Sequence, residues 1–332
     1  MEKVSVIIPA YNSGEKIERC IQSILSQDYP NVEIIVVDDH SKDNIYEILK
    51  GRGIRVIRNK KNLGLAASLN IGINNSSGRY ILTIHDDCKL LSKNFISEGI
   101  KNFRNKKVAG VSGKIVQNYE LMNFVNKLFI VINHNIYDSE GVEKIQFIEN
   151  RCSIYDKEKL KEVNYFDTSF VYSGEDQNLC YKLREKGYEF LSDNSIKYFH
   201  DYGLHQDSLV KNLKHEFLYG ETIPELLFAH GLFFLNKLEK YPKNLRNRTL
   251  FRISMVAFPA FSILSLFFSL LNKIPISIFL ATIFIRLMYF AYLSLKNMEV
   301  LGIIGGLLLP FLGVISDYFY LFGFLRGIIK YL

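Results

Sequence analysis

The sequence predicts a doubly wound α/β domain with a mostly parallel sheet, followed by an α-helical membrane domain. The first observation is an alternation of short β-branched runs with helical patterns from the N-terminus to about residue 200. The second is an abrupt change near residue 250 to long segments that carry almost no charge. We therefore divide the 332 residues into a domain at 1–236, a basic juxtamembrane segment at 237–252, and a membrane domain of two or three helices at 253–332.

The predicted strands share one pattern, because they are short, rich in β-branched residues and apolar along most of their length. That pattern is typical of parallel strands covered by helices on both faces. The strands are expected at 4–9, 32–37, 54–57, 80–84 and 108–112. Helical patterns fill the intervals after Ser13 and at about 42–50, 64–75 and 92–104.

Paired carboxylates follow two of these strands directly. Asp38 and Asp39 come after the second strand, and Asp86 and Asp87 come after the fourth. Ligands of open α/β sheets bind at the carboxyl ends of the strands, where carboxylates hold a divalent cation or accept hydrogen bonds from a base or ribose. Two such pairs indicate a nucleotide with a metal-bridged diphosphate. The alternative for each pair is that it caps the following helix.

The net charge indicates which partners to expect, and the cysteine content indicates the cellular compartment. The net charge is +7, and Lys237–Arg252 alone holds six basic residues and one acid. A basic flank before a long apolar region is typical of the cytoplasmic side of a membrane. We therefore expect a membrane partner and no nucleic acid. The four cysteines form no C-x-x-C pair, which indicates reduced thiols of a cytosolic domain.

The C-terminal part contains three segments that are apolar enough to enter a membrane. Residues 253–271 carry no charge over 19 positions, 274–295 carry only Arg286, and 300–325 carry only Asp317. Each is long enough to cross the hydrocarbon core, for which about 20 residues suffice.

Only Asn272 and Lys273 separate the first two segments, which predicts a tight antiparallel hairpin. Arg286 is expected to face another helix or a lipid phosphate, because an unpaired charge among acyl chains is costly. Pro310 and Asp317 leave the third segment open between a full crossing and a bent or interfacial helix. The first apolar run is too short for a signal peptide. We expect a multi-pass protein of the cell membrane with its first domain in the cytosol.

Five motifs then follow one another along the chain. They are VSVIIPAYN at 4–12, IVVDDHS at 35–41, NLGLAA at 62–67, HDD at 85–87, and YFD at 165–167 with GEDQNLCYKLR at 174–184 and GY at 187–188. With these motifs in this order, residues 3–200 resemble a family 2 glycosyltransferase with the GT-A fold. The membrane segments add a resemblance to enzymes that act on polyprenyl phosphate or lipid-linked glycans.

The resemblance implies an inverting, metal-dependent transfer of one sugar from a UDP- or GDP-sugar to a membrane-associated acceptor, either a polyprenyl phosphate or a lipid-linked glycan. Processive polysaccharide synthases of the family carry a Gln-x-x-Arg-Trp element, and this chain has no Trp. Transfer of a single sugar is therefore the favoured reading. The motifs leave the nucleobase, the sugar, the acceptor and the oligomeric state open.

By the same resemblance, a set of residues at the strand ends binds the nucleotide. The set consists of Pro9, Tyr11, Val37, Asp39, Asn62 and Asp86. Asp39 would accept hydrogen bonds from the base or ribose, because a carboxylate can accept from two donors at once. Asp38 is equally well suited to support the turn.

The metal set implied by the resemblance is Asp87 with Asp86 or His85 beside it, and the cation is Mg²⁺ or Mn²⁺. His200 ends another strand-like run and could complete this set, although a lone histidine is more often structural. His85 stands where the family usually has its first Asp. Imidazole suits Mn²⁺ better than Mg²⁺, which leaves the exact ligand shell open.

The resemblance assigns the catalytic base to Asp176, with Glu175 as its neighbour. A carboxylate on the acceptor side would take the hydroxyl proton during in-line attack. If the acceptor is an ionised phosphate, Asp176 would mainly position it. Both acids also suit the first turn of a helix that runs to Lys186 and is closed by Gly187.

Two other classes of protein remain as alternatives. One is a catalytically inactive nucleotide-sugar-binding or scaffold protein with this fold, which only His85 favours. The other is a nucleotidyltransferase, but Pro9-Ala-Tyr-Asn12 stands where such an enzyme usually has a Gly-rich or basic phosphate loop. A dehydrogenase is excluded, because no G-x-G-x-x-G follows the first strand.

Overall fold

The computed structural model describes two compact units, Met1–Gln117 with Asp138–Asp201 and Asn118–Tyr137 with Tyr202–Leu332. The described residues are 1–14, 16–120, 122–132, 141–170, 173–201, 208–230, 243–271 and 274–331, without the side chains of 243–252 and 331. The second unit includes residues that the sequence assigned to the first domain. The limits at 236 and 252 stay a prediction.

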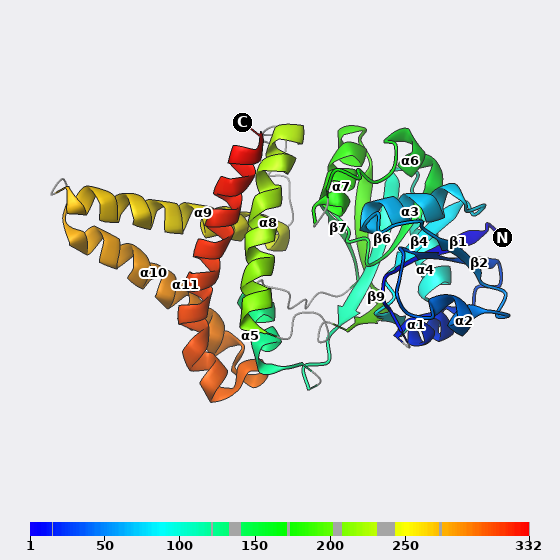
Figure 1. Cartoon of the computed structure of the whole chain (residues 1–332), viewed down its shortest axis with the longest axis horizontal. Helices are drawn as coiled ribbons and strands as arrows, with labels where there is room; N and C mark the ends of the chain where they lie inside the picture. Colours follow the sequence, from blue (N-terminus) through cyan, green and yellow to red (C-terminus); the bar gives the residue numbers. More distant parts are fainter. Residues whose placement is uncertain are drawn as a thin grey trace. The chain divides into compact units, whose positions relative to one another are not determined.

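The first unit is built on one mixed sheet, which has nine strands within the described ranges (Figure 1). The strands are β1 (Val4–Ala10), β2 (Val32–Asp38), β3 (Arg55–Arg58), β4 (Tyr80–Ile84), β5 (Cys88–Leu90), β6 (Val108–Val116), β7 (Val142–Ile145), β8 (Cys152–Asp156) and β9 (Glu189–His200). Their order is β3-β2-β1-β4-β8-β6-β9-β5, and β7 pairs with β9. Only β5, β7 and β8 run against the other described strands, so the mostly parallel α/β fold is confirmed.

Helices cover both faces of this sheet, as the apolar strands required. They are α1 (Lys16–Leu25), α2 (Ile45–Leu49), α3 (Leu65–Asn74), α4 (Phe95–Lys101), the 3₁₀ turn η1 (Asn102–Arg104), α6 (Lys157–Glu162) and α7 (Glu175–Glu185). Side chains alternate along β1, so Val6 and Ile8 pack in one apolar cluster with α1, α2 and α4. Ile7 packs in the opposite cluster with α3, α6 and α7. The four predicted helical patterns are confirmed.

The antiparallel strand β8 determines which residues reach the edge of the sheet where β1, β2 and β4 end. We call this the ligand edge, because open α/β sheets bind ligands there. It lies between β4 and β6, and its first residue, Cys152, pairs with Ile84 at the carboxyl end of β4. Because β8 runs in the opposite direction, the residues before it meet the residues after β4. The main-chain N–H of His85 donates to the carbonyl of Arg151 at 2.9 Å.

The second unit is helical in its described part. It contains α5 (Phe124–Ile132), α8 (Leu209–His230), α9 (Lys243–Leu270), α10 (Ile276–Lys296) and α11 (Met298–Tyr331). Among the described residues, three helical stretches are long and apolar enough to cross a membrane, Ile253–Leu270, Ile276–Lys296 and Met298–Lys330. The three predicted apolar segments are therefore helices of sufficient length, and their sidedness stays a prediction.

Helices α9 and α10 pack side by side and run in opposite directions (Figure 1), as predicted for the hairpin. Their predicted link, Asn272-Lys273, lies outside the described residues. In α11 the backbone leaves helical geometry at Gly302, with φ 64° and ψ 177°, whereas Pro310 lies within the helix. A positive φ favours glycine, so the change of direction occurs at a residue that the sequence did not single out.

Arg286 faces another helix, as predicted. Its guanidinium donates to both carboxylate oxygens of Asp317, at 2.5 and 2.9 Å, and to Ser254 Oγ at 3.0 Å. Arg286 is 4% exposed and Asp317 is 1% exposed. The two charges that interrupt the apolar segments therefore neutralise one another. Their ion pair connects α10 with α11, and the bond from Arg286 to Ser254 connects α10 with α9.

Because the ion pair is buried, replacing either Arg286 or Asp317 alone should destabilise the helical unit. We expect Asp317→Leu to destabilise the helical unit by about 3–5 kcal/mol, because it leaves the Arg286 charge buried without its partner. The double variant Arg286→Met/Asp317→Leu should regain most of that loss. Thermal unfolding in detergent measures both. The expectation is wrong if the double variant is no more stable than Asp317→Leu.

Candidate active site

The ligand edge of the first unit is formed where β1, β2 and β4 end. Pro9 pairs with Val37 across β1 and β2, and the N–H of Asp39 donates to the Ala10 carbonyl at 2.8 Å. Parallel strands end at the same edge, so the residues that follow them gather there. This register brings the two predicted carboxylate pairs to one side of the sheet.

Asp39 organises the start of α3. Its Oδ1 accepts from the Leu63 N–H and from Asn59 Nδ2, and its Oδ2 accepts from the Gly64 N–H, each at 2.8 Å. Asp39 is 4% exposed. Because each carboxylate oxygen has two lone pairs, these three bonds leave Oδ2 one further acceptor position. The helix that follows Asp39 in the chain is α2, which begins without a side-chain cap bond, so the structure does not show the capping alternative for Asp39. The nucleotide role stays a prediction.

Asp38 supports the turn after β2. It is fully buried, accepts from the Ser41 N–H at 2.8 Å, and pairs with Arg58 at 2.6 Å. The predicted turn role of Asp38 is confirmed. Among the other predicted nucleotide residues, Tyr11 is half exposed and Asn62 is exposed.

Pro9 is buried, and the Val37 side chain is fully buried in the apolar cluster under α3. Val37 could therefore line a nucleotide pocket only through its main chain. The roles of Pro9 and Val37 stay predictions, as do those of Tyr11 and Asn62.

Substitutions at Asp39 and Asn62 should distinguish a contribution to folding stability from a contribution to nucleotide-sugar binding. We expect Asp39→Ala to lower the free energy of unfolding by about 1–3 kcal/mol, because three N–H groups lose their acceptor. Asn62→Ala should leave stability within about 0.5 kcal/mol, because the side chain is exposed. It should still weaken nucleotide-sugar binding. Chemical denaturation and calorimetric titration check both variants, and equal loss of stability in the two would contradict the assignment.

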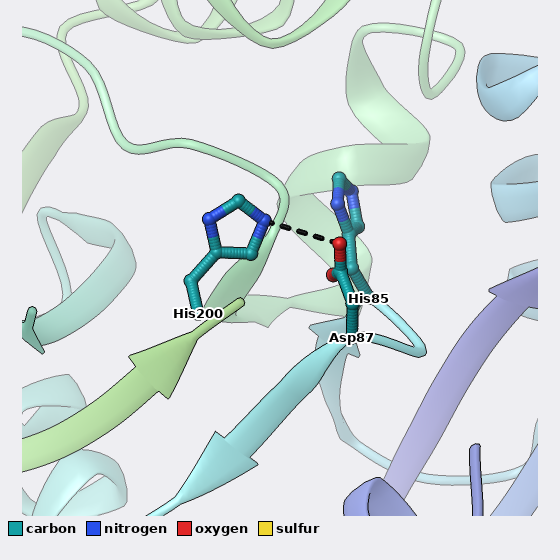
Figure 2. A group of neighbouring side chains, drawn as sticks. All are labelled: His85, Asp87 and His200. Atoms are coloured by element: carbon teal, nitrogen blue, oxygen red, sulfur yellow. Dashed lines mark ion pairs between the residues drawn. The ribbon is translucent and has the colours of Figure 1, made fainter. Parts of the chain in front are cut away.

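Three side chains from two neighbouring segments form a candidate metal centre. One ligand atom each of His85, Asp87 and His200 lies within 4.8 Å of the others (Figure 2). Residues 85–87 follow β4, and antiparallel pairing of Cys88 with His200 brings the end of β9 beside them. Imidazole nitrogen with a carboxylate oxygen suits a divalent transition metal such as Mn²⁺. The residues therefore fit the cation that the motifs implied.

Asp86, which the sequence placed in the same set, makes a different contact. Its Oδ2 accepts from Ser13 Oγ, and Ser13 lies between β1 and α1. Within the described part of the chain, the three-residue group does not include Asp86. Asp86 therefore ties the metal loop to the loop after β1.

His85 is prepared to act as a ligand in its neutral form. Burial lowers its pKa to about 4, against the opposing effect of the Asp87 carboxylate. At neutral pH the imidazole is uncharged, and one ring nitrogen keeps a lone pair. The histidine that departs from the Asp-x-Asp pattern is therefore compatible with metal binding.

His200 is held between a cation and a carboxylate. Arg151 Nη1 lies 3.3 Å from His200 Nδ1, and His200 Nε2 lies 3.4 Å from Asp87 Oδ2. A guanidinium only donates, so Nδ1 is the acceptor and Nε2 donates to Asp87 Oδ2. In this arrangement His200 orients Asp87, and its role as a ligand stays a prediction.

Glu175 and Asp176 form the first turn of α7, after Gly174 at φ 98°. Glu175 is 6% exposed and accepts from Asn150 Nδ2 at 2.7 Å. Burial raises the pKa of Glu175. Burial also raises the pKa of Asp176, and the neighbouring Glu175 charge adds to this effect. A carboxyl pair with raised pKa values is suited to proton transfer.

Sequence reasoning missed Asn150 and Arg151. Both precede β8, and the sequence analysis, which predicted a mostly parallel sheet, included no strand at these residues. The available signal was the polar triplet Glu149-Asn150-Arg151 immediately before the apolar run of β8. Arg151 also pairs with Glu149 at 2.8 Å, which holds its guanidinium near the cluster.

The mixed sheet and the cluster at its ligand edge define a GT-A fold, as the sequence predicted. The described fold agrees with a mannosyltransferase of Pyrobaculum calidifontis, solved with GDP-mannose and Mn²⁺, at a TM-score of 0.63 and 15% identity. That comparison covers 99% of this chain and 88% of the other. GalNAc-T7, solved with UDP, GalNAc and Mn²⁺, aligns at a TM-score of 0.51 and 16% identity over 71% of this chain and 53% of the other.

Residues 5–163 match glycosyl transferase family 2. Just under half of the chain therefore resembles this family.

Curated relatives are similar to this chain over part of their length. The glycosyltransferase GlyG of Streptococcus pneumoniae is 36% identical over 117 residues, which are 34% of this chain and 38% of GlyG. The poly-β-1,6-N-acetyl-D-glucosamine synthase of Staphylococcus epidermidis is 28% identical over 207 residues, or 60% of this chain and 48% of the synthase. The matched region thus spans less than half the length of both relatives.

Proposed function

We propose that the chain is an inverting, metal-dependent glycosyltransferase that moves one sugar from a nucleotide-sugar donor to a membrane-associated acceptor. The acceptor is a polyprenyl phosphate or a lipid-linked glycan. The observation that carries the proposal is the group of His85, Asp87 and His200 at the ligand edge of a family 2 domain. The ligands in the solved neighbours, GDP-mannose in one and UDP with GalNAc in the other, support a nucleotide sugar.

The residues at the edge take distinct roles in this proposal. Asp87 and His85 hold Mn²⁺ or Mg²⁺, with Asp86 steadying the loop and His200 orienting Asp87. When bound, the cation supplies Lewis-acid stabilisation of the departing nucleotide diphosphate. Asp39 takes one hydrogen bond from the nucleoside at its remaining Oδ2 position. Tyr11 and Asn62 are the accessible side chains beside it.

On the acceptor side, Asp176 accepts the proton of the attacking hydroxyl or positions an ionised phosphate. Its raised pKa makes it a stronger base once it is ionised. Glu175, held by Asn150, keeps the acid pair in place. An inverting reaction requires this carboxylate on the face of the sugar opposite to the leaving diphosphate.

The three apolar helices support a membrane-borne acceptor. Anchoring the chain in the bilayer raises the effective concentration of any acceptor that shares the same membrane. The basic residues of 237–252, which precede the first apolar stretch, favour the cytosolic side for the first unit. We therefore propose a multi-pass protein of the cell membrane with a cytosolic catalytic domain.

The experiment is a screen of UDP- and GDP-sugars against the purified full chain, with Mn²⁺ or Mg²⁺ and a polyprenyl phosphate in detergent. One donor should give a glycolipid product, and the anomeric configuration of that product tests inversion. Binding of a donor without turnover on any lipid acceptor would favour the inactive binding protein instead. His85, the single observation for that alternative, is also compatible with a metal ligand in the group of three.

A further inference from the structure

Asn150 lies between the metal group and the acid pair. It is 3% exposed, and both ends of its amide are engaged. Asn150 Nδ2 donates to Glu175 Oε1 at 2.7 Å, and Asn150 Oδ1 lies 3.1 Å from His85 Nε2. One side chain thus connects the loop after β4 with the first turn of α7.

The direction of the amide follows from its partner on α7. Asn150 Nδ2 donates to Glu175 Oε1, and this orientation places the amide oxygen against His85 Nε2. An amide oxygen cannot donate. The proton of the neutral His85 ring is therefore on Nε2, and the lone pair is on Nδ1.

We propose that Asn150 is a positioning residue that selects the His85 tautomer able to bind the cation through Nδ1. The inference rests on the proposed metal site. A histidine that binds a metal usually donates its other ring N–H to a fixed acceptor, which sets both the tautomer and the plane of the ring. Asn150 supplies that acceptor here, and Glu175 fixes the orientation of Asn150.

The contacts of Asn150 also connect the metal group with the acid pair Glu175 and Asp176. Turning the Asn150 amide over would place NH₂ against His85 and oxygen against the Glu175 carboxylate. That arrangement puts the His85 proton on Nδ1, so Nδ1 would no longer offer a lone pair to a cation. The position of the acid pair and the choice of ligating nitrogen are therefore fixed by one amide.

The first measurement needs no metal. Nitrogen-15 spectra of the full chain labelled at histidine should show His85 as the Nε2–H tautomer, with its signals assigned by their loss in His85→Gln. Asn150→Leu should lose this preference, whereas Asn150→Asp, which still offers an oxygen to His85, should keep it. An unchanged tautomer in Asn150→Leu would overturn the inference.

The second measurement is the affinity for Mn²⁺ alone, followed by electron paramagnetic resonance. Asn150→Leu should weaken binding about 10- to 100-fold, as expected for loss of a group that orients a ligand. Asn102→Leu is the matched control, because Asn102 makes a similar contact with Asp193 at 2.8 Å away from the cluster. It should bind Mn²⁺ like the wild type.

The double variant His85→Gln/Asn150→Leu separates positioning from general damage. If Asn150 acts through His85, the double variant should bind Mn²⁺ no more weakly than His85→Gln alone. Additive losses would contradict the inference. Absence of Mn²⁺ binding in the wild type would refute the proposed metal site instead, and the tautomer measurement would then decide the role of Asn150 by itself.

Discussion

Asp87→Ala is expected to reduce sugar transfer on the order of 10³-fold while the domain stays folded. The reason is that Asp87 is the carboxylate of the metal group, and a bound cation contributes several kcal/mol to stabilising the charge on the leaving diphosphate. Turnover should be measured across added Mn²⁺, together with Mn²⁺ affinity. If Asp87→Ala showed near-normal turnover at any Mn²⁺ concentration, Asp87 would not be a metal ligand.

Asp86→Ala is the control for this experiment. Asp86 has the same side chain and adjoins Asp87 in the chain, but it contacts Ser13 and lies outside the three-residue group. We expect Asp86→Ala to keep Mn²⁺ affinity close to that of the wild type. A loss of affinity equal to that of Asp87→Ala would restore Asp86 to the ligand set that the sequence suggested.

Asp176→Asn is expected to lower transfer about 10²- to 10⁴-fold with little change in donor affinity, because the variant cannot accept a proton. The control is Glu185→Gln, on the exposed end of the same helix. Single-turnover rates and donor titrations separate the two effects. If donor binding and transfer fall together, Asp176 belongs to the donor site or to the fold.

The same variant has a predictable effect on stability. Burial raises the pKa of Asp176 in the folded protein, so the folded state holds this proton more tightly than the unfolded state. Wild-type stability therefore falls as pH rises from the unfolded pKa through the folded one. Asp176→Asn should be more stable than the wild type above that range and should lose this advantage below it. Wild-type transfer should rise over the same range if the ionised carboxylate is the base.

The parallel half of the fold was predictable because its strands are buried on both faces. β1 and β2 are apolar at consecutive positions, and few other local structures explain such runs. The antiparallel strands were not predictable in this way. β5 has only three residues, and β8 joins the sheet through partners that are distant in sequence. Asn150 was missed for that reason.

The ion pair between Arg286 and Asp317 is a second feature that could not be predicted from the sequence. Arg286 and Asp317 each interrupt an apolar segment, and hydropathy treats them as two separate costs. Only the packing of α10 against α11 makes them one ion pair. Pro310 and Asp317 left a bent helix open as one alternative for the third segment. The backbone departs from helical geometry at Gly302, which was not predicted because a positive φ cannot be read from hydropathy.

The late position of β8 and β9 in the chain has a consequence for biosynthesis. The contacts of Asp39 with the start of α3 are complete within the first 64 residues. The bond from His85 to Asn150 spans 65 residues, and Asp87 meets a histidine at position 200. Distant contacts form slowly, and chains are made from the N-terminus. A nascent chain should therefore form the contacts of the proposed nucleotide loop well before it can form the proposed metal site.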